Sequence, residues 1–360
     1  MSEPPDPTAR SAAGSATGTA IETVEMHTGG EPVRIVTAGY PAVEGATILD
    51  KRRYAAARLD RLRHLLIFEP RGHHDMYGVI PVAPDHPDAD LAVLFMHNEG
   101  YSTMCGHAVI ALGRWAVDSG QVAPAGDPTT VRIQCPCGLV TARVALRGDA
   151  NGAARTGEVA FESVPAFALA LDRTVEVAGH GSVSLDIGYG GAFYAVLPAA
   201  RFGLDVLASP TRDLVDAAAA VTRAVADQVP IDHPGDPDLG FLYGTILTDG
   251  PNDGSHGADR ARPSANICVF AGAQVDRSPT GSGVTARIAL MRARGTIAPG
   301  EAAYFESVTR SIFRGRALAE TTVGPHDAVT VEVTGHAHYT GTARFTVEPD
   351  DLLAGGFLLK

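Results

Sequence analysis

Two stretches of this sequence decide its fold: Met104-Cys105-Gly106-His107 and Asp276-Arg277-Ser278-Pro279-Thr280-Gly281-Ser282-Gly283. Each runs directly into an apolar segment, at residues 108–117 and 284–293, whose composition is typical of a buried helix. A glycine follows each segment, and Gly120 lies as far after Cys105 as Gly295 lies after Thr280. The two halves of the chain are therefore predicted to be variations on one design, each built around a helix that begins at a glycine-containing loop.

Such a loop at the start of a helix is suited to binding an anion. The first backbone N–H groups of a helix lack partners and carry a partial positive charge, which favours a carboxylate or a developing enolate. A thiol at this position is expected to have a lowered pKa, so Cys105 is a candidate to take or give a proton near neutral pH. The alternative is that the glycines only let the chain turn, and that Cys105 is a small buried hydrophobic residue.

The sequences of the two loops resemble those of the proline racemase family, whose members are similar to diaminopimelate epimerase in fold. The resemblance extends to residues 27–32, 69–78, 186–194 and 266–270, and only about the first twenty residues fall outside it. It implies an α/β fold with two pseudo-symmetric domains, each with strands wrapped around a central helix.

The resemblance also suggests where the two domains lie in the chain. The first domain is expected to comprise residues 20–187 together with 341–360, and the second to comprise residues 188–340. Residues 1–19 are rich in Pro, Ser, Ala, Gly and Thr, and are expected to form a disordered tail.

The second loop departs from the racemases and epimerases of this family, which carry a cysteine in both loops. Here the second position is Thr280. Racemisation needs a second acid or base on the opposite face of the α-carbon, and a threonine hydroxyl has no accessible pKa near neutrality. A Cys and Thr pair resembles the branch of the family that catalyses a dehydration. The resemblance therefore implies that trans-3-hydroxy-L-proline loses water to give pyrroline-2-carboxylate.

The stereochemistry of this substrate suits a single base. In trans-3-hydroxyproline the hydroxyl lies opposite the carboxylate, and so on the same face of the ring as the α-hydrogen. Cys105 is expected to take the α-proton, and the resulting thiol, or a water that it polarises, to protonate the departing hydroxyl. Thr280 is expected to fill space and to hydrogen-bond on the opposite face.

The family's substrate contacts can be carried over to matching positions. The backbone amides of Gly106, His107, Gly281 and Ser282 are expected to hold the carboxylate and to stabilise its enediolate-like form. Asp276 is expected to accept from the ring ammonium, although an aspartate in this setting is otherwise a turn or cap residue. The imidazole of His107 has two interpretations, as a structural group or as a neighbour of the substrate.

No cofactor or metal is predicted. Pyridoxal phosphate would need a lysine, and the only lysines are Lys51, within a basic patch, and Lys360. The histidines lack the spacing of a ligand set, and Cys135 and Cys137 have no second thiol pair nearby. Cys135 and Cys137 are expected to sit in a turn without a disulfide, and Cys268 is expected to be a core thiol.

Composition and charge limit the classes of partner. The chain has 360 residues and a net charge of −12, which argues against nucleic acid and anionic membranes. A small-molecule imino acid substrate is what the family resemblance implies. It shows neither a membrane-length apolar run nor a secretory signal, and a functional thiol favours a reducing cytoplasm. The sequence does not determine the oligomeric state, and a homodimer is one possible assembly.

Short apolar runs predict strands around the two helices. The predicted strands lie at residues 33–36, 65–68, 91–95, 131–133, 139–142, 183–187, 193–197, 241–243, 267–270, 329–333 and 344–347. An alanine-rich amphipathic helix is predicted at residues 211–229, followed by a loop at 230–237.

Three other functions stay open at this point. The first is a proline or hydroxyproline racemase or epimerase that works with one thiol. The second is a thiol hydrolase with Cys105 as nucleophile and His107 as base, which is disfavoured because a two-residue separation at a helix start is expected to point the side chains apart. The third is a noncatalytic imino-acid binding protein.

Overall fold

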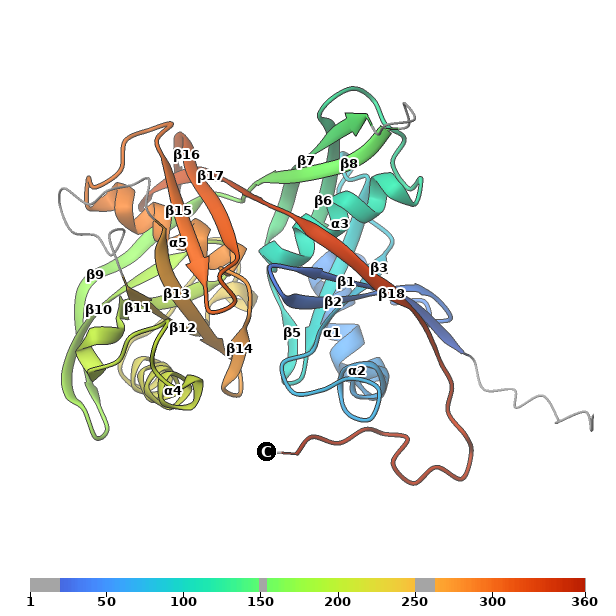
Figure 1. Cartoon of the computed structure of the whole chain (residues 1–360), viewed down its shortest axis with the longest axis horizontal. Helices are drawn as coiled ribbons and strands as arrows, with labels where there is room; N and C mark the ends of the chain where they lie inside the picture. Colours follow the sequence, from blue (N-terminus) through green and yellow to red (C-terminus); the bar gives the residue numbers. More distant parts are fainter. Residues whose placement is uncertain (1–19, 149–153, 250–262, 360) are drawn as a thin grey trace, which may run out of the picture.

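The computed structural model describes residues 20–148, 154–249 and 263–359. It confirms the predicted α/β architecture of two similar lobes, each with strands wrapped around one central helix (Figure 1). The central helices are α3 (Gly106–Asp118) in the first lobe and α5 (Gly281–Ala293) in the second. The predicted N-terminal tail at residues 1–19 lies outside the described residues.

The strands of the first lobe surround α3. Antiparallel pairs join β1 to β2 and β18, β3 to β4, and β6 to β7 and then β8, while β2–β3 and β4–β6 are parallel. The strands are β1 (Ile21–Thr28), β2 (Glu31–Ala38), β3 (Tyr77–Val82), β4 (Leu91–His97), β5 (Gly100–Ser102), β6 (Thr129–Cys135), β7 (Gly138–Gly148), β8 (Ala154–Glu162) and β18 (Ala337–Phe345).

The strands of the second lobe form a closed ring around α5. Going round the ring, β9 pairs with β10, then come β11, β12, β13, β15, β16 and β17, and β17 returns to β9. The strands are β9 (Ala166–Val177), β10 (Gly181–Tyr189), β11 (Phe193–Pro198), β12 (Leu242–Asp249), β13 (Ser264–Phe270), β14 (Gln274–Asp276), β15 (Ala302–Ser307), β16 (Ile312–Val323) and β17 (His326–Gly335).

Strand β17 joins the two lobes. It pairs with β9 of the second lobe and, near its end, with β8 of the first, before the chain continues into β18 against β1. Strands β9 and β10, which lie before residue 188 except for the last two residues of β10, pack on α5. The domain boundaries predicted from the sequence remain a proposal.

The remaining helices lie outside the two strand layers. Helix α4 packs against β12 and β9 and agrees with the amphipathic helix predicted at residues 211–229. These elements are α1 (Ile48–Tyr54), the π-helical turn η1 (Ala55–Leu59), α2 (Asp60–Ile67), the short helix η2 (Ala199–Phe202), α4 (Thr211–Gln228) and the short helix η3 (Pro237–Leu239).

The central helices are buried almost all round. Every residue of α3 is buried except Arg114 and Asp118. Arg287 on α5 is buried too, and its guanidinium donates to Asn266 Oδ1 at 3.1 Å and to Ser264 Oγ at 2.8 Å, over the Phe305 ring. A buried charge is costly unless it is hydrogen-bonded, and these contacts satisfy it.

Each central helix is followed by a glycine with a positive φ. These are Gly120, at φ 75°, and Gly295, at φ 65°. Glycine adopts this conformation without steric cost, so it allows the chain to turn away at the C-terminal end of each central helix. The repeated spacing seen in the sequence therefore marks two equivalent helix ends.

One predicted strand is wrong. Residues 65–68 were predicted to be extended, but residues 60–67 form helix α2. Leu62, Leu65 and Leu66 are buried at helical spacing, and Arg63 pairs with Asp60 one turn earlier. The apolar run of four residues is the buried face of a helix whose first turn is polar, so the run alone cannot distinguish the two structures.

Candidate active site

The two helix starts meet between the lobes. Cys105 is the residue before the first turn of α3, and Thr280 holds the same position on α5. Between them the backbones of Gly106 and Gly281 lie in contact, because a Cβ atom built on Gly106 would be 2.5 Å from the Gly281 Cα. The symmetric arrangement predicted from the sequence is therefore present, with the N-terminal N–H groups of both helices directed to one place.

A small cavity lies at this meeting point. The structure brings every predicted site residue to its wall, together with aromatic residues and a further thiol. The lining residues are Tyr77, Met104, Cys105, Gly106, His107, Tyr194, Tyr243, Cys268, Phe270, Asp276, Thr280, Gly281 and Ser282.

The imidazole of His107 lies beside the thiol of Cys105. Its Nδ1 and Nε2 are 3.2 Å and 3.5 Å from the sulfur, and its ring also donates to the Pro32 carbonyl. The expectation that these two side chains point apart is therefore wrong. The extended backbone of Cys105, at φ −146°, places its side chain back over the first turn, where it also accepts from the Ala108 N–H.

Burial controls the charge state of this pair. It raises the pKa of the Cys105 thiol well above its ordinary value; the Ala108 N–H opposes this effect, and the carboxylate of Asp276 adds to it. Burial also lowers the pKa of His107. The lowered thiol pKa expected from the helix start is not found, because desolvation of the Cys105 thiol outweighs the N–H groups.

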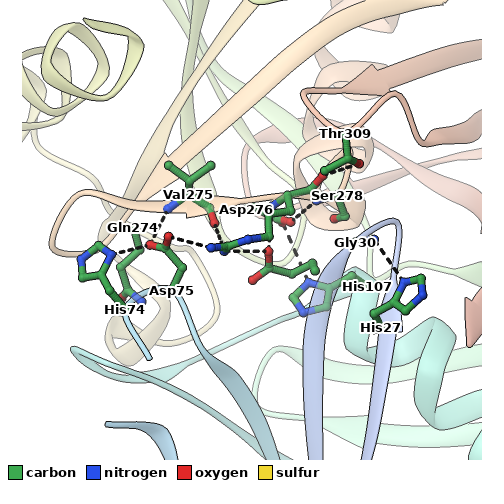
Figure 2. A network of polar contacts seen from close by, with 12 residues as sticks. His27, Gly30, His74, Asp75, His107, Gln274, Val275, Asp276, Ser278 and Thr309 are labelled. Atoms are coloured by element: carbon green, nitrogen blue, oxygen red, sulfur yellow. Dashed lines mark hydrogen bonds and ion pairs between the residues drawn. The ribbon is translucent and has the colours of Figure 1, made fainter. Parts of the chain in front are cut away.

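Asp276 stands at the end of β14, where the chain turns into the second loop. Its Oδ1 accepts from the Ser278 N–H at 2.8 Å, and its Oδ2 is 3.9 Å from His107 Nδ1 (Figure 2). The side chain is thus both a turn cap, the alternative weighed for it, and a group on the cavity wall. A carboxylate with one oxygen directed to the site can accept from a cationic ligand.

A partly buried network next to Asp276 links the lobes. The Arg277 N–H donates to Glu31 Oε2 at 2.7 Å, and the Arg277 guanidinium pairs with Asp75 at 3.1 Å. Asp75 also accepts from the Val275 N–H (Figure 2). Burial raises the pKa of Glu31 well above its ordinary value, and nearby Asp276 adds to this effect. Residues 31 and 75 belong to segments that carry the family resemblance, and they fix β14 against the first lobe.

Thr280 and Ser282 form the opposite side of the cavity. Thr280 has a φ of 63°, and its Oγ is buried without a hydrogen-bond partner among the described residues. Ser282 Oγ lies 2.7 Å from the hydroxyl of Tyr194. An unpartnered buried hydroxyl at a cavity wall is a group that a ligand can satisfy.

Several lining residues were not predicted from the sequence. Tyr77 and Tyr194 lie in segments that carry the family resemblance, but no role was assigned to them. Tyr243 reaches the cavity from β12, and nothing in its local sequence indicates this. Cys268 was predicted to be a core thiol; it is fully buried, yet it lines the cavity.

The described residues show no group of three or more His, Cys, Asp or Glu side chains that could hold a metal ion. Cys135 ends β6 and Cys137 lies in the tight turn before β7, in line with the predicted turn, and all four cysteines are free. Within the described ranges, no helix is both long and apolar enough to cross a membrane.

Comparison with known proteins identifies the family. The proline racemase family model matches residues 23–358. This chain belongs to the proline racemase family. Among relatives, it is 57% identical over 345 residues to the trans-L-3-hydroxyproline dehydratase of Xenopus tropicalis, covering 95% of this chain and 96% of the relative. It is 43% identical over 340 residues to the 3-hydroxyproline 2-epimerase of Burkholderia multivorans, covering 94% and 98%.

Two solved structures share this fold. A probable proline racemase from Agrobacterium radiobacter K84, with bound carbonate, superposes with a TM-score of 0.86 at 27% identity, covering 94% of this chain and 96% of that one. A hydroxyproline epimerase from Agrobacterium vitis, with bound trans-4-hydroxy-L-proline, gives a TM-score of 0.85 at 26% identity, covering 95% and 96%.

Proposed function

We propose that this protein dehydrates trans-3-hydroxy-L-proline to pyrroline-2-carboxylate, as a hydro-lyase with a cysteine at the start of one central helix and a threonine at the start of the other. The observation that carries the proposal is the pairing of Cys105 with Thr280 across one small cavity, in a chain that is 57% identical to a dehydratase of this substrate. One side of the cavity has a group that can become a base. The other side has an alcohol that cannot exchange a proton with carbon at neutral pH.

The helix starts hold the substrate carboxylate. Backbone N–H groups of Gly106, His107, Gly281 and Ser282 donate to it and to the enediolate-like charge that develops when the α-proton leaves. Preorganised N–H donors in a site closed to water stabilise such charge strongly. Asp276 accepts from the ring ammonium and so fixes the orientation of the ring.

Substrate binding also prepares the base. The carboxylate of Asp276 is one of the groups that raise the pKa of Cys105, and the substrate's ammonium offsets that charge. His107, with a ring nitrogen 3.2 Å from the sulfur, takes the thiol proton, and the attraction between the imidazolium and the thiolate offsets the burial that lowers the pKa of His107 and raises the pKa of Cys105. The resulting Cys105 thiolate removes the α-proton, and the 3-hydroxyl leaves as water from the same face. The enamine product tautomerises to the cyclic imine.

A decisive experiment is incubation of the purified protein with trans-3-hydroxy-L-proline in deuterated water, followed by trapping of the cyclic imine. Stoichiometric imine formation, with no inversion at C2 of the remaining substrate, supports the proposal. Inversion at C2 without imine would establish the alternative that the Burkholderia multivorans relative represents, a 3-hydroxyproline epimerase. Binding without either change would establish a noncatalytic binding protein.

The contact between Cys105 and His107 is also the geometry that a thiol hydrolase needs. An acyl-enzyme would be its signature. Incubation with activated esters, followed by mass measurement of the protein, tests this second function. We expect no acyl adduct on Cys105, because the cavity between the two helix starts is small and walled by aromatic side chains.

We also propose that the enzyme works in the cytoplasm as a homodimer. The four free cysteines, one of them the proposed base, suit a reducing compartment. Fractionation of cells with an antibody to the protein tests the compartment. Light scattering after size-exclusion chromatography tests the assembly state.

A further inference from the structure

A cluster of hydroxyl groups lies beside Cys105 and has no part in the chemistry described so far. Tyr77 begins β3, Ser102 ends β5, and Tyr243 comes from β12 of the other lobe. The Tyr77 hydroxyl is hydrogen-bonded to the Ser102 hydroxyl. Tyr77, Tyr243 and Cys105 line the same cavity. Tyr77 is 2% exposed and Ser102 is 1% exposed.

The phenol of Tyr77 is held in one orientation. The edge of its ring packs against the His107 ring, with centroids 4.9 Å apart and planes at 74°. Because His107 also contacts the Cys105 sulfur, this packing places the Tyr77 ring beside the Cys105–His107 pair. Tyr194, in contrast, is hydrogen-bonded to Ser282 at the start of the other helix.

The position of Tyr77 matters because of the geometry of the substrate. The 3-hydroxyl and the α-hydrogen of trans-3-hydroxy-L-proline project from the same face of the ring. A base at Cys105 therefore places the departing oxygen on the same side of the cavity as the Tyr77 hydroxyl. Hydroxide is a poor leaving group, so a proton donor at this place is what the reaction requires.

We propose that Tyr77 is the general acid that protonates the departing 3-hydroxyl, an inference that rests on the proposed dehydration. The protons balance without an outside acid. The Cys105 thiolate takes the α-proton as the C2–C3 double bond forms and the C3–O bond breaks. Tyr77 gives its phenolic proton to the leaving oxygen, which departs as water. The Cys105 thiol then returns the α-proton to the Tyr77 phenolate, and both groups are restored.

The surroundings of Tyr77 suit this role. Burial raises its pKa well above the ordinary value, so the phenol carries its proton at neutral pH. When the phenolate forms, the hydroxyls of Ser102 and Tyr243 can donate to it, which limits the cost of a buried charge. The water-forming step then takes place without bulk solvent.

The test compares the wild-type enzyme with Tyr77→Phe, which keeps the ring and removes only the hydroxyl. We expect imine formation from trans-3-hydroxy-L-proline to fall by at least ~100-fold. In deuterated water, the recovered substrate should gain deuterium at C2 with its configuration retained, because Cys105 still removes and returns the proton while C3–O cleavage is slow. Tyr189→Phe is the matched control, since Tyr189 is buried, does not line the cavity, and its hydroxyl has no partner among the described residues.

A substrate with a different leaving group makes the test specific. Fluoride is a much weaker base than hydroxide and needs no full protonation, so trans-3-fluoro-L-proline should lose fluoride at similar rates with wild type and Tyr77→Phe. Undiminished dehydration by Tyr77→Phe would overturn the proposal. Equal loss of dehydration, exchange and fluoride release would overturn it too, because Tyr77 would then act through Cys105 or the fold. Absence of dehydration by the wild type would instead overturn the proposed function.

Discussion

Gly106 and Gly281 touch each other across the two lobes. A Cβ atom on Gly106 would lie 2.5 Å from the Gly281 Cα, and one on Gly281 would lie 2.7 Å from the Gly106 Cα. Non-bonded carbon atoms cannot approach so closely, so any larger residue at either position would push the helix starts apart. The spacing of the N–H groups around the cavity depends on this contact.

We therefore predict that Gly106→Ala and Gly281→Ala each reduce dehydration by about 100-fold, the scale expected for a shift of roughly 1 Å in a positioning group. Overpacking should also lower the free energy of unfolding by about 1–3 kcal/mol. Steady-state kinetics and urea denaturation measure both effects. Gly341→Ala is the control, because its Cβ would meet open space. Normal activity in both site variants would contradict the contact.

Cys105→Ala should abolish the proposed base without disturbing the fold. Loss of a general base costs about 10²–10⁴-fold in rate, and the backbone N–H groups that hold the carboxylate remain. We expect calorimetric binding of trans-3-hydroxy-L-proline to persist while imine formation disappears. Cys135→Ala, which removes a buried thiol that does not line the cavity, should retain activity. Dehydration by Cys105→Ala would show that another group removes the proton.

Thr280→Cys should add a second base on the other helix. A thiol there can return a proton to the opposite face of the α-carbon, so the variant should invert C2 of proline or of the hydroxylated substrate. Chiral chromatography of the recovered imino acid detects the inverted product. Thr280→Ser provides the comparison, because it keeps an alcohol and should dehydrate without inversion. If Thr280→Cys exchanges the α-proton without inverting the substrate, Thr280 does not face the α-carbon.

His97 should make the fold sensitive to acid. It lies on β4 of the first lobe, with Nδ1 3.2 Å from Gln274 Oε1 of the second, and burial lowers the pKa of His97 to about 3. Between pH 6.5 and pH 3, His97 is protonated in the unfolded chain, where its pKa is 6.5, but stays neutral in the folded protein. The free energy of unfolding should thus fall by about 1.4 kcal/mol per pH unit from pH 6.5 downward, and level off near pH 3.

Urea denaturation of the wild type and of His97→Gln across this pH range measures the effect. The variant keeps a hydrogen-bonding side chain but cannot be protonated, so its stability should depend less steeply on pH. His180→Gln, at an exposed position, serves as the comparison. Parallel pH profiles for wild type and His97→Gln would contradict the assignment.

The sequence predicts the two central helices and most strands because their patterns are local. The segments at 108–117 and 284–293 are mostly apolar, and a helix of that kind must be enclosed by other elements. The run at residues 65–68 was misassigned because four apolar residues fit a strand as well as the buried face of α2. Only the polar first turn at Asp60–Arg63 distinguishes the two.

The site could be predicted only in part, for a similar reason. Cys105, Thr280 and Asp276 lie in the loops that carry the family resemblance. Tyr243 and Cys268 reach the cavity through the pairing of β12 with β13, which brings distant segments together and leaves no local mark. The raised pKa of Cys105 is likewise a property of the closed cavity, since desolvation depends on every wall at once.

Strand β18 pairs with β1, so the sheet of the first lobe cannot be completed until β18 has been synthesised. Most of the first lobe emerges early, but one edge of β1 must wait for its partner until nearly the whole chain has been translated. During that interval an open strand edge is available for mispairing with other nascent chains. The lobe that carries Cys105 is therefore begun first and finished last, and chaperone dependence should be greatest while β1 is unpaired.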